Sequence, residues 1–360
     1  MPTFALTNET LKFYYDDSGV PSTPGYTTYV VVHGLAYHGG VFQRLLPVVN
    51  QHSHRMVTVN RREYPNSTPY TQAELDIFAR GSDEERYQLL LNEGKYLNLL
   101  LDGLIQSLAL PPNIVIVGWS LGSIFTLSML ASITSLSQTV QERLSDSVKK
   151  TILWGKYYTK TLKKFNFAEC SKEPPAHSLG MKLPPLYLPL LDDNIPFDER
   201  PLRFMQWVAL HFQHGDLSLR HDITQLDQGR NNLQRINAFD TTPAEELATI
   251  TDIRPATRCD NYLLVPSFSD AEHRILHNAL FDPATRLSWG DMDIWHLVGD
   301  RGPHSVHFAT WYFEDLLQLA GTPKPAIRLA VNPGASHFHM WEDPEDAMKE
   351  LELLTFTPSP

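Results

Sequence analysis

Short apolar runs rich in β-branched residues recur along the chain, and segments with helical spacing of apolar positions lie between several of them. Side chains alternate across a strand and recur every three or four positions along a helix, so the two patterns predict different elements. The predicted strands are Leu11–Tyr15, Thr28–Val32, Met56–Val59, Ile114–Val117, Thr151–Trp154, Ile294–Val298 and Ile327–Val331.

The clearest helical pattern covers residues 84–108, and residues 304–320 and 344–354 have the same spacing. The apolar face of the first of these consists of Leu97, Leu100, Leu101, Leu104, Ile105 and Leu108. Pro344 followed by acidic residues is typical of a helix start. Strands that alternate with helices favour a mostly parallel, doubly wound sheet with helices on both faces. The predicted fold class is therefore α/β.

From residue 157 to residue 270 this alternation disappears, and the chain becomes proline-rich and aromatic. An insertion that follows a strand of a parallel sheet would lie over the carboxyl ends of the strands, where such sheets bind ligands. We therefore predict an inserted cap at 157–270 and a core formed by 1–156 and 271–360. The cap aromatics interpreted as packing rather than recognition are Tyr187, Phe204, Trp207 and Phe212.

The formal net charge of −11 and the pI near 5.7 indicate no basic patch, so neither nucleic acid nor an anionic membrane is an expected partner. Only Cys170 and Cys259 are present, too few for a disulfide framework. The first residues do not read as a secretory signal, and glycine and serine interrupt the apolar stretch at 114–132. We expect a cytoplasmic protein that acts on a small-molecule substrate, and no oligomeric state is predicted.

Residues 114–122 read IVIVGWSLG and precede a helix-like segment, which places Ser120 between two glycines at a strand-to-helix turn. This pattern is typical of a nucleophile elbow, whose strained backbone lifts the serine hydroxyl clear of the main chain. We predict that Ser120 is a catalytic nucleophile. A structural turn or a dead site is the alternative interpretation.

A second motif, YVVVHGLAYHGG, ends a predicted strand at His33 and Gly34. In acyl-transfer sites, an N–H from such a loop and the N–H after the nucleophile face the developing oxyanion. The candidates are the amides of Leu35 and Leu121, although the motif alone also fits an ordinary glycine turn. The residues expected to line the substrate pocket are Trp119, His33, Gly34 and Phe338.

A serine hydroxyl needs a general base, because at neutral pH it is a poor nucleophile until an imidazole accepts its proton. The chain has 15 histidines, so position must narrow the choice. A strand, a glycine-containing loop and an acidic helix start follow one another in LAVNPGASHFHMWEDPEDAMKEL. We predict that His337 in this loop is the base, with His339 as the second candidate.

The chain resembles the α/β-hydrolase superfamily over nearly its whole length outside the cap, and most of all poorly characterised fungal hydrolases. The resemblance rests on HGLA (33–36), NRREYPNS (60–67), GWSLG (118–122), LVGDRGP (297–303) and GASHF (334–338). It implies an α/β-hydrolase sheet with a cap, and it places His337 at the position of the family's base. Members usually have a glycine where Glu63 stands.

The acid of the expected triad is where the sequence departs from that family. Members usually have an aspartate three residues after the glycine that ends the penultimate strand, and here Gly302 stands there. A second family position, after the strand that follows the nucleophile, reads WGKYYTK and holds no acid either. Asp300 is the nearest substitute, while Asp291, Asp293 and a cap carboxylate stay open. Substitution of the triad acid lowers turnover about 10⁴-fold, so the missing aspartate bears directly on the expected activity.

We therefore expect a serine hydrolase that cleaves an ester, a lactone or a related carbonyl compound through an acyl-enzyme. An acyltransferase or cyclase of secondary metabolism would use the same site, and a ligand-binding protein that has lost its triad is the third possibility. No cofactor is expected, because no G-x-G-x-x-G follows a strand. No metal is expected either, because His304 and His307 lack a third ligand at a characteristic spacing.

Overall fold

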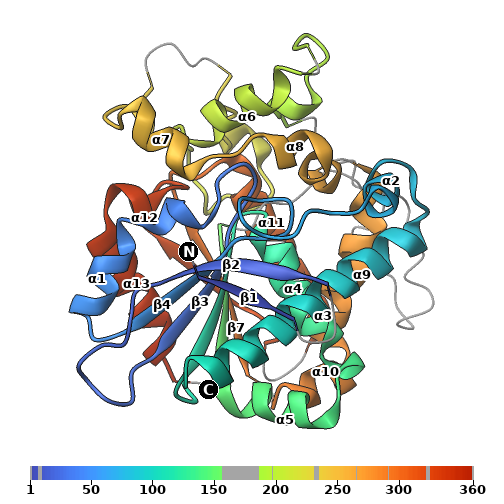
Figure 1. Ribbon diagram of the computed structural model, residues 1–360. Coiled ribbons are helices and arrows are strands. Elements are labelled where there is room, and N and C mark those ends of the chain that lie inside the picture. The colour runs from blue at the N-terminus through green and yellow to red at the C-terminus, as the bar shows by residue number, and fades with distance from the viewer. Residues whose placement is uncertain are drawn as a thin grey trace.

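Strands β1 to β8 form one sheet in the order β1-β2-β4-β3-β5-β6-β7-β8 (Figure 1). The strands are β1 Thr3–Ala5, β2 Lys12–Asp17, β3 Thr28–Val32, β4 Arg55–Val59, β5 Ile114–Trp119, β6 Val148–Trp154, β7 Asp293–Gly299 and β8 Arg328–Asn332. The computed structural model describes residues 2–6, 10–155, 186–196, 198–230, 235–264, 266–290, 292–321 and 325–358. All the predicted strands are confirmed, and β1 is an addition.

The sheet is parallel from β4 to β8, and only the pairings of β2 with β1 and β4 are antiparallel. Every residue of β3, β4 and β5 is buried, as expected for strands covered on both faces. The register pairs Val32 with Gly118 and Trp119 with Trp154. The carboxyl ends of β3, β5 and β6 therefore lie side by side.

Helices cover both faces of the sheet, which confirms the doubly wound α/β fold (Figure 1). Helices α1 (Leu45–Gln51) and α13 (Pro344–Phe356) pack together on one face, and α3 (Asp83–Ser107), α4 (Gly122–Ser132) and α9 (Ser269–Phe281) pack on the other. The remaining α-helices are α2 Gln72–Arg80, α5 Gln138–Ser147, α6 Arg200–Val208, α7 Ala244–Ile250, α8 Arg254–Arg258, α10 Pro283–Ser288, α11 His304–Ala320 and α12 His339–Glu342. The 3₁₀ turns are η1 Gly39–Phe42, η2 Ile133–Ser135, η4 Pro189–Leu191, η5 Ile223–Gln225, η6 Asp260–Leu264 and η7 Pro266–Phe268.

Helices α3 and α4 approach each other closely at Gly94. A Cβ at this position would lie 2.0 Å from the Ser128 carbonyl oxygen of α4. One turn further along α3, the Asn98 amide donates to the Met129 carbonyl oxygen at 2.8 Å. The closeness of these helices thus depends on a residue without a side chain.

Helices α6, α7 and α8 lie together above the sheet (Figure 1). They belong to residues 186–264, which contact the loops at the carboxyl ends of the strands. The Asp252 amide donates to the Ala36 carbonyl after β3, and the Phe212 amide donates to the Arg301 carbonyl after β7. These contacts fit a cap, but its predicted beginning at residue 157 lies outside the described residues, so the division into core and cap stays a prediction.

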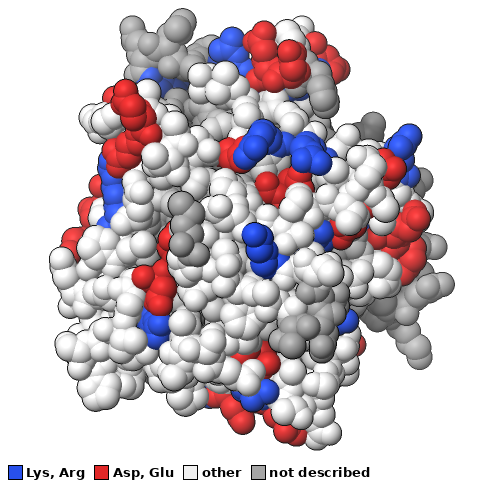
Figure 2. Space-filling view, viewed as in Figure 1, with Lys and Arg blue, Asp and Glu red and all other residues white. Residues whose placement is uncertain are grey.

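Charged side chains are interspersed on the surface. On the face seen in Figure 2, Lys and Arg form small separate groups among acidic and uncharged residues. None of the helices in the described ranges combines the length and the apolar character needed to cross a bilayer.

The Gly94→Ala substitution should lower the free energy of unfolding by about 2 kcal/mol, because the added methyl group would push two packed helices apart. The matched control is Gly103→Ala in the same helix, where the new Cβ would meet only the Phe4 ring of the edge strand β1. That ring can turn aside, so the control should change stability by less than about 1 kcal/mol. Urea unfolding measures the free energy of unfolding of both variants. Equal losses would contradict the conclusion that the close approach of α3 and α4 depends on Gly94.

Candidate active site

Ser120 stands at the sharp turn between β5 and α4. Its φ of 54° lies in the left-handed region, which residues with a side chain rarely adopt. Its amide donates to the Trp154 carbonyl at 2.8 Å, so the turn is held at the end of β6. The structure thus contains the strand, the strained turn and the helix that the sequence predicts.

Glycines allow neighbouring segments to reach the turn. A Cβ at Gly122 would lie 2.2 Å from the Val32 carbonyl oxygen, so α4 starts directly against the end of β3. A Cβ at Gly34 would lie 2.9 Å from the Ser120 Cβ. The loop after β3 therefore contacts the serine itself.

The amides of Leu35 and Leu121 flank this contact. Both residues are buried, and neither amide has a hydrogen-bond acceptor among the residues that the structure describes. A buried N–H without an acceptor is rare in folded proteins. Two such groups beside one serine could stabilise an oxyanion that forms there.

His337 lies next to the same strand ends. A Cβ at Gly155, the residue after β6, would lie 3.1 Å from the His337 Nδ1. The His337 ring centroid is 5.2 Å from that of Trp119, whose Nε1 donates to the His337 carbonyl at 3.1 Å. Ser120 and His337 are thus both adjacent to the Trp154–Gly155 backbone. No hydrogen bond joins the two side chains in the described structure, and such bonds are often loose before substrate binds.

Burial alone lowers the pKa of His337 from 6.5 to about 3. A neighbouring carboxylate would oppose this effect by favouring the imidazolium. Within the described ranges, no Asp or Glu oxygen forms a hydrogen bond or an ion pair with the His337 ring. The His337 ring, the predicted base, is therefore held by packing and kept neutral.

Asp300 lies in the predicted loop after β7, and its carboxylate accepts a hydrogen bond from the backbone of the next loop. Its Oδ1 accepts the Gly334 amide at 2.7 Å, and its own amide donates to the Asn332 carbonyl. Because it stands directly after β7, its short side chain reaches the backbone of the loop that leads to His337 and not the His337 ring. The described contacts give Asp300 a role in shaping that loop, and they do not bring it to the base.

Asp293, another open acid candidate, lies away from His337. Asp293 begins β7 and is therefore at the amino edge of the sheet, while Asp291 lies outside the described residues. His339, the second candidate base, is bound to Asp346 of α13 at 2.8 Å. Three cap carboxylates are paired with arginines, as Asp227–Arg235, Asp252–Arg254 and Asp260–Arg61.

The residues predicted to line the substrate pocket are almost completely buried. Both ring nitrogens of His33 have partners, since Nε2 accepts the Arg61 amide at 3.0 Å and Nδ1 lies 2.9 Å from the Gly34 carbonyl oxygen. The Phe338 ring packs against Trp119 and against Phe239 of the cap. His33 thus supports the loop, and a pocket lined by these residues stays a prediction.

The histidines of α11 have structural partners. His304 bonds the Tyr187 carbonyl through Nε2 at 2.7 Å, and its pKa is lowered to about 4, chiefly by burial. Burial is also the main cause that lowers the pKa of His307 to about 3. Among the described residues, no group of His, Cys, Asp and Glu side chains could hold a metal ion.

Sequence reasoning missed the buried charges that follow β4. The Arg61 guanidinium forms an ion pair with Asp260, and the next residue, Arg62, pairs with Glu93. The available signal was two consecutive arginines one residue after a buried strand. Glu63, which replaces the family's glycine, keeps the left-handed φ of 73°, and its carboxylate pairs with Arg258.

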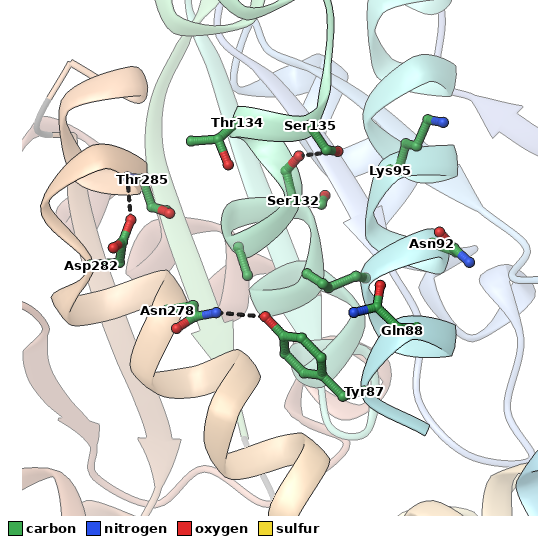
Figure 3. Close-up of a pocket in the computed structure, with 12 residues that line it drawn as sticks. Tyr87, Gln88, Asn92, Lys95, Ser132, Thr134, Ser135, Asn278, Asp282 and Thr285 are labelled. Carbon is green, nitrogen blue, oxygen red and sulfur yellow. Dashed lines mark hydrogen bonds between the residues drawn. The ribbon is translucent and has the colours of Figure 1, made fainter. Parts of the chain in front are cut away.

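A polar groove lies at the opposite end of α4 (Figure 3). It has a volume of 360 Å³ and is bordered by α3, η2, α9 and α10. Tyr87, Lys95 and Asn278 are among its lining residues. Ser132 also lines it and ends the helix that begins at Gly122, so it lies about 16 Å from the elbow. The groove is therefore separate from the candidate site.

Comparison with known proteins gives a match to a family described as the alpha/beta hydrolase family, over residues 29–351. Among solved structures, a carboxylesterase of the thaumarchaeon Nitrososphaera gargenis is similar, with 14% identity, a TM-score of 0.52 and coverage of 98% of this chain and 97% of that one. The proline iminopeptidase of Mycobacterium smegmatis gives 11% identity, a TM-score of 0.52 and the same coverages. These likenesses concern the fold. No curated protein sequence matches the chain.

Replacing His337 by glutamine should make stability less sensitive to acid. The pKa of His337 is about 3 in the folded protein and about 6.5 in the unfolded chain, so the unfolded chain binds the proton more readily. As the pH falls below 6.5, protonation therefore favours the unfolded chain and lowers the free energy of unfolding. Between pH 7 and pH 4.5, His337→Gln should lose about 2–3 kcal/mol less than the wild type.

Urea unfolding at the two pH values measures this difference. His277→Gln, a change at an exposed position of α9, is the control and should behave like the wild type. An equal acid response of the wild type and His337→Gln would contradict the buried, neutral imidazole.

Proposed function

This chain belongs to the alpha/beta hydrolase family, and on that premise we propose that it is a serine hydrolase that cleaves an ester, a lactone or a related carbonyl compound. The observation that carries the proposal is the left-handed backbone of Ser120 beside the amides of two buried residues, Leu35 and Leu121, which have no acceptor among the described residues. A turn of merely structural use would not need a strained serine there.

The proposed reaction has two steps. The Ser120 Oγ attacks the carbonyl carbon while His337 accepts the hydroxyl proton, and the Leu35 and Leu121 amides donate to the oxyanion. His337 then returns the proton to the leaving oxygen, which departs and leaves an ester on Ser120. Water attacks this acyl-enzyme with His337 as base, and the acid and the free serine result.

The surroundings of His337 support slow turnover. Among the described residues no carboxylate adjoins His337 to stabilise the imidazolium that forms during attack, and loss of this partner costs about 10⁴ in other serine triads. A base with a pKa of about 3 is also a weak proton acceptor. The same observation favours a second candidate, a protein that binds a carbonyl ligand without cleaving it.

The neighbouring side chains support an apolar substrate group. Tyr37 and Phe239 stack with ring centroids 5.4 Å apart, and the Phe338 ring lies 4.7 Å from Tyr37. We propose that these rings form one wall of the substrate pocket, which suits an acyl or alcohol group without charge. We place the activity in the cytoplasm, which the buried free thiol of Cys259 supports.

Ser120→Ala should abolish covalent labelling by a fluorophosphonate probe and lower hydrolysis of p-nitrophenyl butyrate at least about 10³-fold, because both reactions need the nucleophilic oxygen. The control is Ser128→Ala, which removes a hydroxyl of α4 that donates to the Ile124 carbonyl. The control should be labelled like the wild type. Labelling of Ser120→Ala at the wild-type rate would refute the nucleophile.

If the wild type is labelled but does not turn over the ester, the binding function is the better account. Turnover that depends on Ser120 excludes it.

The kcat/KM of p-nitrophenyl butyrate hydrolysis should change by less than about twofold between pH 8 and pH 5. The neutral imidazole is the active form, and its lowered pKa of about 3 keeps it neutral over this whole range. The rate is read at the wavelength where p-nitrophenol and p-nitrophenolate absorb equally. An acid limb centred near pH 6.5 would mean that another, less buried base acts.

A further inference from the structure

The ion pair of Arg61 and Asp260 joins the core to the cap beneath the loop of residues 33–36, which we name the oxyanion loop. Two nitrogens of the guanidinium donate to the two carboxylate oxygens, at 3.0 and 2.6 Å. Both side chains are 1% exposed. A buried ion pair adds little net stability compared with apolar residues of the same size, so stability alone does not explain it.

The remaining donors of Arg61 bind the oxyanion loop itself. Its Nε donates to the His33 carbonyl at 3.1 Å, and its Nη2 donates to the Gly34 carbonyl at 2.9 Å. The guanidinium also lies 4.3 Å from the centre of the Phe125 ring in α4. The Arg61 guanidinium thus lies between the oxyanion loop and α4, the helix that follows Ser120.

The Gly34 carbonyl decides where the next amide points. In a trans peptide, the C=O of one residue and the N–H of the next are directed to opposite sides, and this chain has no cis peptide bond among the described residues. Because Arg61, together with the His33 Nδ1, holds the Gly34 oxygen on the Arg61 side, the Leu35 N–H must face away from Arg61. That N–H is the amide without an acceptor described above.

A second connection holds the loop on the other side of Leu35. The Ala36 amide donates to the Tyr64 hydroxyl at 2.8 Å, and this hydroxyl donates to Asp260 Oδ2 at 2.6 Å. One cap carboxylate therefore fixes, through Arg61 and Tyr64, the peptide groups on both sides of Leu35.

We propose that Arg61, held by Asp260, is a positioning residue that sets the direction of the Leu35 amide and so completes the oxyanion hole only when residues 260–264 of the cap are in place. This inference rests on the proposed serine hydrolase function. Rate should depend on it strongly, because a small misplacement of a preorganised donor costs up to about 10²-fold.

Arg62 provides a matched control. It is the next residue, is 2% exposed and pairs with the buried Glu93 at 3.0 Å. Its other bonds go to Glu74 and to the Pro69 carbonyl, and it donates to no residue of the oxyanion loop. Arg62→Lys thus disturbs a comparable buried pair without touching the loop.

The test compares Arg61→Lys with Arg62→Lys. Lysine keeps the charge, but its three donors cannot replace the four hydrogen bonds of the guanidinium to two carbonyls and both carboxylate oxygens. Arg61→Lys should lower the kcat for p-nitrophenyl butyrate and the rate constant of fluorophosphonate labelling about 10- to 100-fold, with KM within about threefold. Arg62→Lys should leave all three within about threefold. Equal effects of the two variants, or a loss of Arg61→Lys confined to KM, would overturn the proposal.

Tyr64→Phe removes a single oxygen, the hydroxyl that connects the Ala36 amide to Asp260. It tests the positioning of the oxyanion loop even if Arg61→Lys does not fold. It should lower kcat about tenfold with KM within about threefold, and a folded Tyr64→Phe with wild-type kcat would overturn the proposal. Ser120→Ala, measured in parallel, distinguishes a failure of the proposed hydrolase function from a failure of the positioning role of Arg61. Wild-type turnover of Ser120→Ala would remove the proposed function, whereas its loss together with normal kcat in Arg61→Lys would remove only the positioning role.

Discussion

The hydrogen bond from the Ser120 amide to the Trp154 carbonyl fixes the turn on which the rest of the site depends. It holds Ser120 in a left-handed conformation at the end of β6, where the next residue, Gly155, lies against the His337 ring. The close approach of Gly34, in the loop after β3, to the Ser120 side chain depends on the same turn. Three strand ends and one strained residue thus bring together segments that are more than 200 positions apart.

Burial of His337 with no carboxylate partner among the described residues is the feature that sets this site apart from an ordinary serine triad. Packing against Trp119 and Gly155 orients the ring, and burial keeps it neutral. Electrostatic support is concentrated instead at the oxyanion loop, where Arg61 and Asp260 are fully paired. In the proposed site, the oxyanion donors are therefore well fixed and the base, His337, is weak.

The strands and the elbow could be predicted because each is encoded locally. Apolar runs such as Ile114–Val117 define buried strands, and two glycines around Ser120 define the turn. The contacts of Asp300 could not be predicted, because its loop is right but the direction of a short side chain depends on where Gly334 lies. The pair of Arg61 and Asp260 joins residues 199 positions apart, so no local pattern indicates it. The edge strand β1 is only three residues long and largely exposed, and therefore leaves no apolar run.

The most direct measurement is a crystal structure of the protein after reaction with a fluorophosphonate, whose phosphoryl oxygen mimics the oxyanion of the acyl-transfer step. We expect a covalent bond from the Ser120 Oγ to phosphorus, with the phosphoryl oxygen about 2.7–3.1 Å from the amide nitrogens of Leu35 and Leu121. A phosphoryl oxygen that faces any other group, or phosphorus bound to a different residue, would contradict it.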